Sequence, residues 1–180
     1  SEEFAENAEL VGRLRQYMRD NAMLYATVVA GKEEAGQKFS DYFDHAEKFA
    51  TAPGHRVLAM LRGFNEEVLS VAIEADRDSP SPVKPAQQMI ARFFDIDGEG
   101  KANAFLMQVA GWCWRVKLST SLSLDLMREM RERAEDEAIN VFARNLKDLL
   151  LAAPAGSRVT LGLDPGIRTG VKVAAVDGTG

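Results

Sequence analysis

The chain has 180 residues, 46% of them hydrophobic, so it can bury a core and is not a disordered tail. Its 22 Lys and Arg residues against 27 Asp and Glu residues give a net charge of -5, which excludes an overall basic field for nucleic acid or an anionic membrane. Any contact with nucleic acid must therefore be local. No apolar run reaches the ~20 residues of a membrane span, and the single cysteine suits a reducing compartment. These features predict a cytoplasmic protein with no membrane partner.

The first half of the chain predicts helices around a small β element. Apolar residues at three- and four-residue steps predict a helix over 4–18, and similar spacing predicts another over 33–49. The breaker "TAPGH" precedes a further helix over 55–63. Segment 68–76 is rich in β-branched residues and predicts a strand, and segment 23–29 predicts a second strand, with a short helix as its alternative. As strands, the two segments are candidates to pair with each other.

The second half predicts a surface linker and three more helices. Prolines and serines place the linker at 76–85, and helices are expected over 85–94 and 102–117. The serines of "STSLS" are candidate N-caps for a long helix over 122–151, which would measure ~45 Å. Its arginines alternate with acids, which predicts a solvated face suited to connecting domains. The predicted inner stripe of this helix comprises Met127, Met130, Ala134, Ala138, Val141 and Phe142.

Residues 1–157 contain few candidates for catalysis. His45 and His55 are ten residues apart, without the spacing of a zinc site, so a structural role is predicted for both. Trp112 and Trp114 are two residues apart and cannot share one helical face, so at least one is expected in the core, with base stacking as the alternative for the other. The sequence also lacks a serine–histidine–aspartate order and a phosphate-binding Gly-Lys-Ser/Thr motif.

The last residues, 158–180, predict a β-hairpin. "RVTLGLD" is an apolar strand ending in Asp164, "PGIRTG" turns the chain, and "VKVAAVD" is the return strand. Gly166 and Gly170 permit a positive φ or a close approach of the backbone to a phosphate. Three interpretations are open: a structural turn, one carboxylate of a metal-dependent nuclease, or the phosphate-cradling hairpin of a sugar-kinase or actin-like ATPase.

The sequence "GLDPGIRTGVKVAAVD" resembles the opening hairpin of the YqgF, or resolvase-like, domain of bacterial Tex-type transcription accessory proteins. The segments "GKEEAGQKFSDYFDHAE", "GHRVLAMLRGFNEEVLSV" and "ERAEDEAINVFARNLKDLLLAAPAG" are also similar to Tex, so the resemblance covers nearly the whole chain. It implies an internal fragment that is mainly α. Residues 1–157 would be the helical region, and 158–180 the first hairpin of a truncated ribonuclease H-like domain.

The resemblance also implies roles for individual residues. Asp164 matches the first-strand aspartate that helps to bind Mg²⁺ in active nucleases of this fold, but the other ligands would lie outside this chain, so no cofactor is expected here. Arg168, at the loop tip, and Lys172 are the expected contacts to nucleic acid, with a solvated or structural role as the alternative for Arg168. Asp164, Gly166, Thr169 and Lys172 are also placed as in the ATPase alternative, which lacks its second phosphate loop.

The function expected from this resemblance is that of a helical scaffold in a nucleic-acid-binding transcription accessory factor. RNA or DNA would bind mainly through domains absent here, including an OB-fold domain, and the transcription machinery is the expected partner. No catalytic residue is assigned and the chain is not expected to be an enzyme; a fragment of a resolvase-like nuclease is the alternative, and an actin-like phosphotransferase comes third. The hairpin is expected to be disordered, to fold back on the helical body, or to pair with a second chain.

Overall fold

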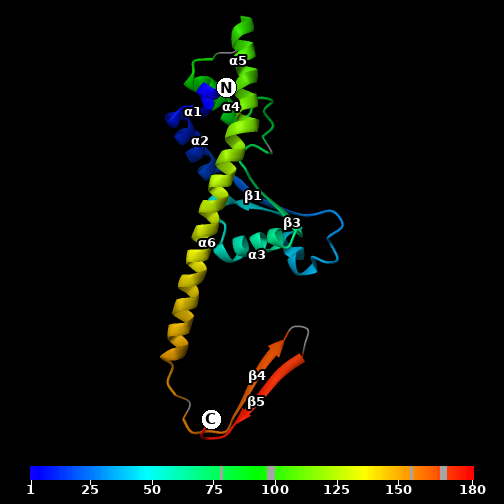
Figure 1. The fold of residues 1–180 in the computed structure, drawn as a ribbon, viewed down its shortest axis with the longest axis vertical. Coiled ribbons are helices and arrows are strands. Elements are labelled where there is room, and N and C mark those ends of the chain that lie inside the picture. The colour runs from blue at the N-terminus through cyan, green and yellow to red at the C-terminus, as the bar shows by residue number, and fades with distance from the viewer. Residues whose placement is uncertain (78, 97–99, 155, 167–169) are drawn as a thin grey trace. The chain divides into compact units, whose positions relative to one another are not determined.

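The structure is a computed structural model. It describes residues 1–77, 79–96, 100–154, 156–166 and 170–180. The chain forms two compact units, residues 1–140 and 141–180. Helices dominate the first unit and a β-hairpin ends the second, so the predicted mainly α fold class is confirmed (Figure 1). Within the described residues, no helix is both long and apolar enough to cross a membrane.

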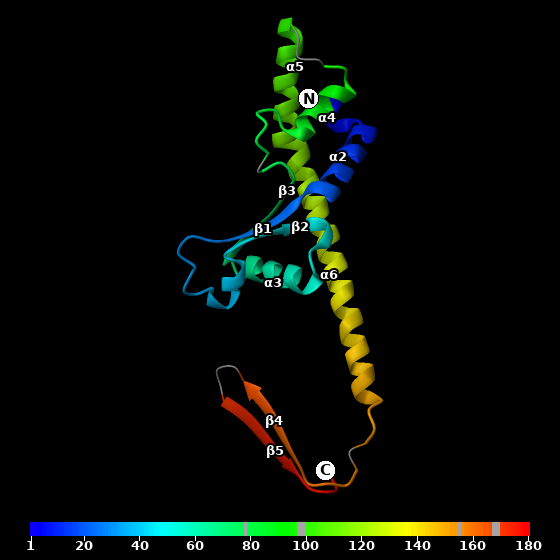
Figure 2. The same cartoon turned by 180° about the vertical axis from the view of Figure 1, so that it is seen from behind.

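The first unit is built on a layer of helices beside one long helical segment (Figures 1 and 2). The helices of this layer are α1 (Glu2–Glu6), α2 (Ala8–Asn21) and α4 (Pro85–Phe93), and the long segment begins with α5 (Gly100–Cys113). Helix α2 begins where the Asn7 side chain accepts a hydrogen bond from the Leu10 amide at 2.9 Å, a regular N-cap. Its buried residues Leu10, Leu14 and Met18 recur at four-residue steps, and they form the core face that the spacing predicts.

The long segment continues from α5 through a π-helical stretch, η3 (Trp114–Leu118), into α6 (Ser119–Leu150). Buried residues recur at four-residue steps along it, and because four exceeds the 3.6 residues of a helical turn, this stripe winds around the helix. The stripe therefore packs against different neighbours along its length. Its members are Ala110, Trp114, Leu118, Leu122, Leu126, Met130 and Ala134.

The predicted break at "STSLS" is wrong, because the chain stays helical through these serines. The Ser119 hydroxyl donates to the Arg115 carbonyl one turn earlier, at 3.2 Å, and the Ser123 hydroxyl donates to the Ile73 carbonyl, at 2.8 Å. Serines that bond in this way do not need to cap a new helix. The predicted inner stripe is correct at Met130 and Ala134, which are buried, and at Met127, which is partly buried against the core, whereas every described residue after Ala134 is exposed.

The first unit also contains a small antiparallel sheet in the order β2-β1-β3. Its strands are β1 (Met23–Val28), β2 (Asp44–Lys48) and β3 (Leu69–Glu74). The predicted pairing of the first and last of these strands is confirmed: Leu24 lies opposite Ile73, and both side chains are buried in the core. The central strand β1 is completed on its other edge by β2, which the sequence interpretation missed.

The helix predicted over 33–49 is wrong. This segment forms turns, a short 3₁₀ helix η1 (Gln37–Tyr42) and then β2. Phe39 packs with Val68 and Leu69 in a small second cluster, and Gly36 has no room for a Cβ atom beside Val68. Pairing with β1 therefore overrides the local helical spacing.

Helix α3 (Gly54–Asn65) and the short 3₁₀ helix η2 (Phe49–Thr51) that precedes it attach the sheet to α6. The Gly54 amide donates to Glu137 Oε2 at 3.2 Å, and Arg133 donates to the Phe49 carbonyl at 3.2 Å. On the sheet side, Arg56 forms an ion pair with Glu47 at 2.6 Å. The charged residues of α6 that the sequence assigns to a solvated face thus include two that hold the first unit together.

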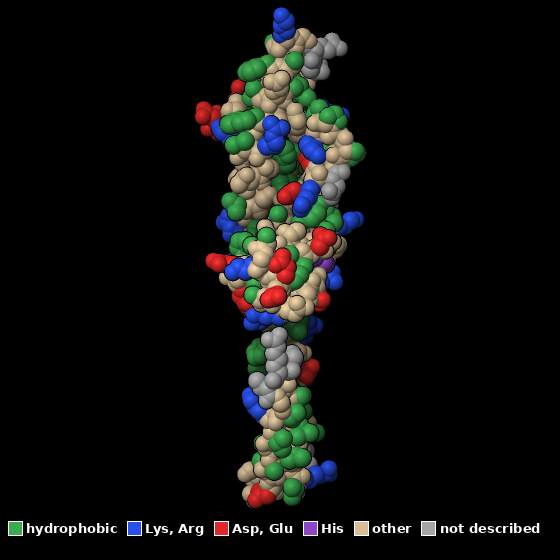
Figure 3. Space-filling view, turned by 90° about the vertical axis from the view of Figure 1, so that its right-hand side faces the viewer, with side chains coloured by type: hydrophobic (Ala, Val, Ile, Leu, Met, Phe, Trp, Pro, Cys, Tyr) green, Lys and Arg blue, Asp and Glu red, His purple; other side chains and the backbone are tan. Residues whose placement is uncertain are grey.

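The second unit ends in the predicted hairpin, formed by β4 (Thr160–Gly166) and β5 (Gly170–Val176). Leu161, Leu163, Val171 and Val173 are each more than half exposed. Figure 3 shows hydrophobic side chains along the visible face of this hairpin. An antiparallel pair with no second layer exposes apolar side chains that a larger sheet would bury.

Candidate functional site

Of the hairpin residues predicted to bind a metal or nucleic acid, the structure places Asp164 and Lys172 next to each other. Asp164 lies opposite Lys172 in the strand register, with Lys172 Nζ 3.8 Å from Asp164 Oδ2, and both side chains are more than three-quarters exposed. This is a solvent-exposed cross-strand ion pair in which each charge partly neutralises the other. Arg168 and Thr169 lie outside the described residues. No group of three His, Cys, Asp or Glu side chains arranged for a metal occurs among the residues described.

The turn that follows the hairpin is stabilised by its own aspartate. Asp177 Oδ1 accepts hydrogen bonds from the Thr179 hydroxyl at 2.7 Å and from the Thr179 amide at 2.8 Å. The hydroxyl bond, followed by the amide bond, lowers the pKa of the Asp177 carboxyl. This carboxylate is thus occupied by a local turn and offers little to an external ligand.

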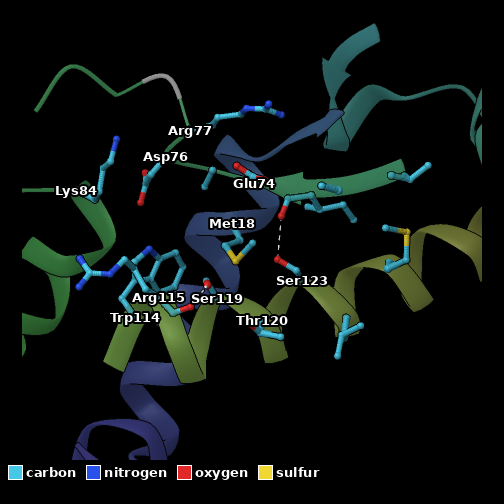
Figure 4. Close-up of a pocket in the computed structure, with 16 residues that line it drawn as sticks. Met18, Glu74, Asp76, Arg77, Lys84, Trp114, Arg115, Ser119, Thr120 and Ser123 are labelled. Atoms are coloured by element: carbon cyan, nitrogen blue, oxygen red, sulfur yellow. Dashed lines mark hydrogen bonds between the residues drawn. The ribbon is translucent and has the colours of Figure 1, made fainter. Parts of the chain in front are cut away.

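A hollow of about 630 Å³ lies in the first unit between the outer edge of β3 and the first turns of α6 (Figure 4). Val71 and Ile73 form one wall, and Ser119, Thr120 and Leu124 of the helix form the other. Basic side chains occur around it, at Arg77, Lys84 and Arg115, and Figure 4 shows that they do not converge on one point. The hollow has the volume of a small-molecule pocket but not the convergent polar groups of one.

Asp76, at one end of this hollow, is the one buried charged residue among those described. Its Oδ1 accepts a hydrogen bond from the Tyr17 hydroxyl at 2.6 Å, and its Oδ2 accepts from the Ala86 amide at 3.4 Å. Burial, and then the bond to Asp76, raise the pKa of the Tyr17 phenol. The carboxylate therefore joins α2, the end of β3 and the start of α4, a structural role that the prediction of a surface linker over 76–85 misses.

The two tryptophans have different environments. Trp114 is 6% exposed and belongs to the core, while Trp112 is 45% exposed. Lys117 Nζ lies 6.0 Å from the centre of the Trp112 ring, at the outer limit of a cation–π contact. The prediction that at least one tryptophan packs in the core is confirmed, and the other is free to contact a ligand.

Comparison with known proteins gives a consistent result. The family model described as Tex central region-like matches residues 1–142. "Protein YhgF" of Escherichia coli (strain K12) is 53% identical over 182 residues, which cover 99% of this chain and 24% of that protein. "Transcriptional accessory protein Tex" of Neisseria gonorrhoeae is 49% identical over 181 residues, again 99% of this chain and 24% of that protein.

A less similar relative has a name that refers to RNA binding. "S1 RNA-binding domain-containing protein 1" of Pongo abelii is 41% identical over 133 residues, which cover 69% of this chain and 13% of that protein. The resemblance drawn from the sequence is thus confirmed. The chain spans about a quarter of the length of the two bacterial relatives.

Proposed function

Because the chain belongs to the Tex central region-like family, we propose that it is the helical scaffold of a nucleic-acid-binding transcription accessory factor. The names of the relatives support both parts of this proposal, transcription for one and RNA binding for another. The RNA or DNA contacts of the parent would lie mainly in the three-quarters of its length outside this chain. We propose a cytoplasmic location and the transcription machinery as the partner on the same grounds.

The observation that supports the scaffold role is the continuity of α6. The boundary between the two compact units falls after Asn140, inside this helix, and not in a loop. A helix is a stiffer spacer than a Gly- or Ser-rich linker of the same length. Up to Ala134 the helix supplies core residues to the first unit, which fixes that end of it.

Replacing residues 141–150 by a Gly/Ser linker of equal length in the full-length parent should weaken its binding to a labelled RNA. Domains that act together on one strand lose effective concentration when a stiff connection becomes flexible, so a loss of about tenfold or more is expected. Fluorescence anisotropy measures the affinity, and circular dichroism of the first unit serves as the folding control. An unchanged affinity would count against the scaffold role.

We also propose that this chain has no catalytic activity of its own. Asp164 pairs with Lys172 on an exposed hairpin, and one carboxylate cannot hold the two metal ions of a resolvase-like site. Incubation with Mg²⁺ and branched or single-stranded nucleic acid should give no cleavage above the level of Asp164→Asn. Cleavage that depends on Mg²⁺ and disappears in Asp164→Asn would establish the nuclease alternative.

Self-association through the hairpin stays a prediction. The exposed apolar side chains Leu161, Leu163 and Val173 would favour pairing with a second chain when the rest of the parent is absent. Light scattering across a range of concentrations distinguishes a dimer from a monomer. A clean monomer at high concentration would eliminate the dimer.

A further inference from the structure

One face of α5 and η3 carries exposed aromatic and basic side chains on successive turns. The steps of four, three, four and three residues keep the set on one side of a helix. All of its members are exposed, so none is needed for the core. The set, here called the α5 face, is Lys101, Phe105, Gln108, Trp112 and Arg115.

The charge of this region is opposite to that of the whole chain. Residues 100–124 contain Lys101, Arg115 and Lys117 and no Asp or Glu, although the chain has a net charge of -5. Among the described residues, Lys117 Nζ lies 4.0 Å from Oε1 of Glu2, whose side chain is 82% exposed. Such a contact is weak in water and is easily displaced by a ligand anion.

The aromatic rings of the α5 face are open to solvent. Phe105 is 64% exposed and Trp112 is 45% exposed. Large exposed aromatics between cations are typical of surfaces that stack unpaired bases while holding the sugar–phosphate backbone. Leu106 and Val116 border this face, and they would also suit a protein partner, but aliphatic side chains alone do not account for two exposed rings flanked by a cation at each end.

We propose that the α5 face binds single-stranded nucleic acid. Bases would stack on Trp112 and Phe105, and the phosphates would lie near Lys101, Arg115 and Lys117. Gln108, between the two rings, would offer an amide to a base edge. Because every base has a flat aromatic face, this contact would be tolerant of sequence. The inference rests on the proposed function and deepens it, by placing a nucleic-acid contact on the scaffold itself.

The first experiment measures binding of fluorescein-labelled oligouridylate and oligothymidylate to the 180-residue chain by anisotropy. Three phosphate contacts, each contributing about 0.7 to the slope, predict that the logarithm of the binding constant falls with the logarithm of salt concentration with a slope of about -2. Affinity should thus fall by about twentyfold between about 50 and about 200 mM salt. Bound oligonucleotide should also quench tryptophan fluorescence, because Trp112 is exposed.

Variants then separate stacking from general surface effects. Trp112→Ala should weaken binding by about 5-fold to 150-fold, and Trp112→Phe should retain most of it, because a ring is preserved. Phe64→Ala is the matched aromatic control, since Phe64 is 49% exposed and lies on α3, outside α5 and η3. For charge, Arg115→Gln should reduce both the affinity and the salt slope. Arg131→Gln, an exposed arginine among acids on α6, should change neither.

Three results would overturn the inference. The first is no binding of either oligonucleotide at low salt, and the second is an equal loss in Phe64→Ala and Trp112→Ala. The third is binding that Trp112→Ala leaves intact. If the 180-residue chain fails to bind while the full-length parent binds RNA, the α5 face is wrong and the proposed function still stands. If the parent also fails, the proposed function is wrong as well.

Discussion

Leu126→Ala is expected to lower the free energy of unfolding of the first unit by about 2–5 kcal/mol. Leu126 is fully buried, at 0% exposure, in the middle of the stripe that joins the long helical segment to the rest of the core. Removing its branched end deletes apolar contacts and leaves a cavity that close-packed neighbours fill only in part. Urea unfolding monitored by circular dichroism measures the effect.

Leu124→Ala is the control for this prediction. Leu124 lies on the same helix, two residues away, and is 65% exposed. The same chemical change there should alter the free energy of unfolding by less than about 0.5 kcal/mol. Similar losses in both variants would show that the first half of α6 is not the core element described here.

Tyr17→Phe is expected to destabilise the first unit by about 1.5–3 kcal/mol, because it removes the hydrogen bond to a buried carboxylate. Asp76 would keep only the longer bond from the Ala86 amide, at 3.4 Å. Tyr42→Phe is a suitable control, since the Tyr42 hydroxyl makes no hydrogen bond among the residues described. Equal stability of the wild type and Tyr17→Phe would refute the role assigned to Asp76.

The pH dependence of the Tyr17 contribution follows from its raised pKa. A phenol whose pKa is higher in the folded state contributes its full stabilisation below the unfolded pKa of about 10. That contribution is then lost as the pH rises toward the folded value. The stability difference between wild type and Tyr17→Phe should therefore be constant through neutral pH and shrink in alkaline solution above about pH 10.

The sequence predicted the elements whose signals are local. The apolar steps of α2, Pro85 at the start of α4 and the strands at 160–166 and 170–176 all follow from patterns that neighbouring residues complete among themselves. The pairing of β1 with β3 was also predictable, because both segments are β-branched and flanked by turn residues.

The missed features depend on tertiary partners. β2 has the polar sequence "DHAEK" and becomes a strand only because the edge of β1 is available to it. Ser119 caps no new helix because its hydroxyl bonds to the Arg115 carbonyl one turn earlier, and the Ser123 hydroxyl bonds to the Ile73 carbonyl of β3, which sequence alone does not place nearby. The burial of Asp76 could not be predicted from the sequence, because its partners Tyr17 and Ala86 lie on α2 and α4.

Some features of the candidate site could likewise be predicted from the sequence, and others could not. Asp164 and Lys172 are neighbours because a hairpin register follows from its turn, so their pairing was within reach of sequence reasoning. The exposure of Trp112 was not, because the choice between two tryptophans depends on which helical face meets the core. The domain boundary placed between 157 and 158 stays a prediction, and Arg168 stays a predicted contact outside the described residues.

The scaffold role of α6 is tested by changing its helical phase in the full-length parent. Inserting residues between Ala143 and Arg144, both exposed, rotates whatever follows by about 100° per residue. An alanine-rich insert of two residues turns the following part by about 200°, whereas one of seven residues nearly restores the phase while adding about 10 Å. Binding of a long labelled RNA is then measured for each insert.

If α6 acts as a scaffold, the two-residue insert should strongly lower the affinity of the parent for RNA, and the seven-residue insert should recover most of it. Recovery by the longer insert separates a loss of phase from a loss of folding, because the larger change would otherwise do more damage. Equal affinities for both inserts and for the wild type would contradict the scaffold role.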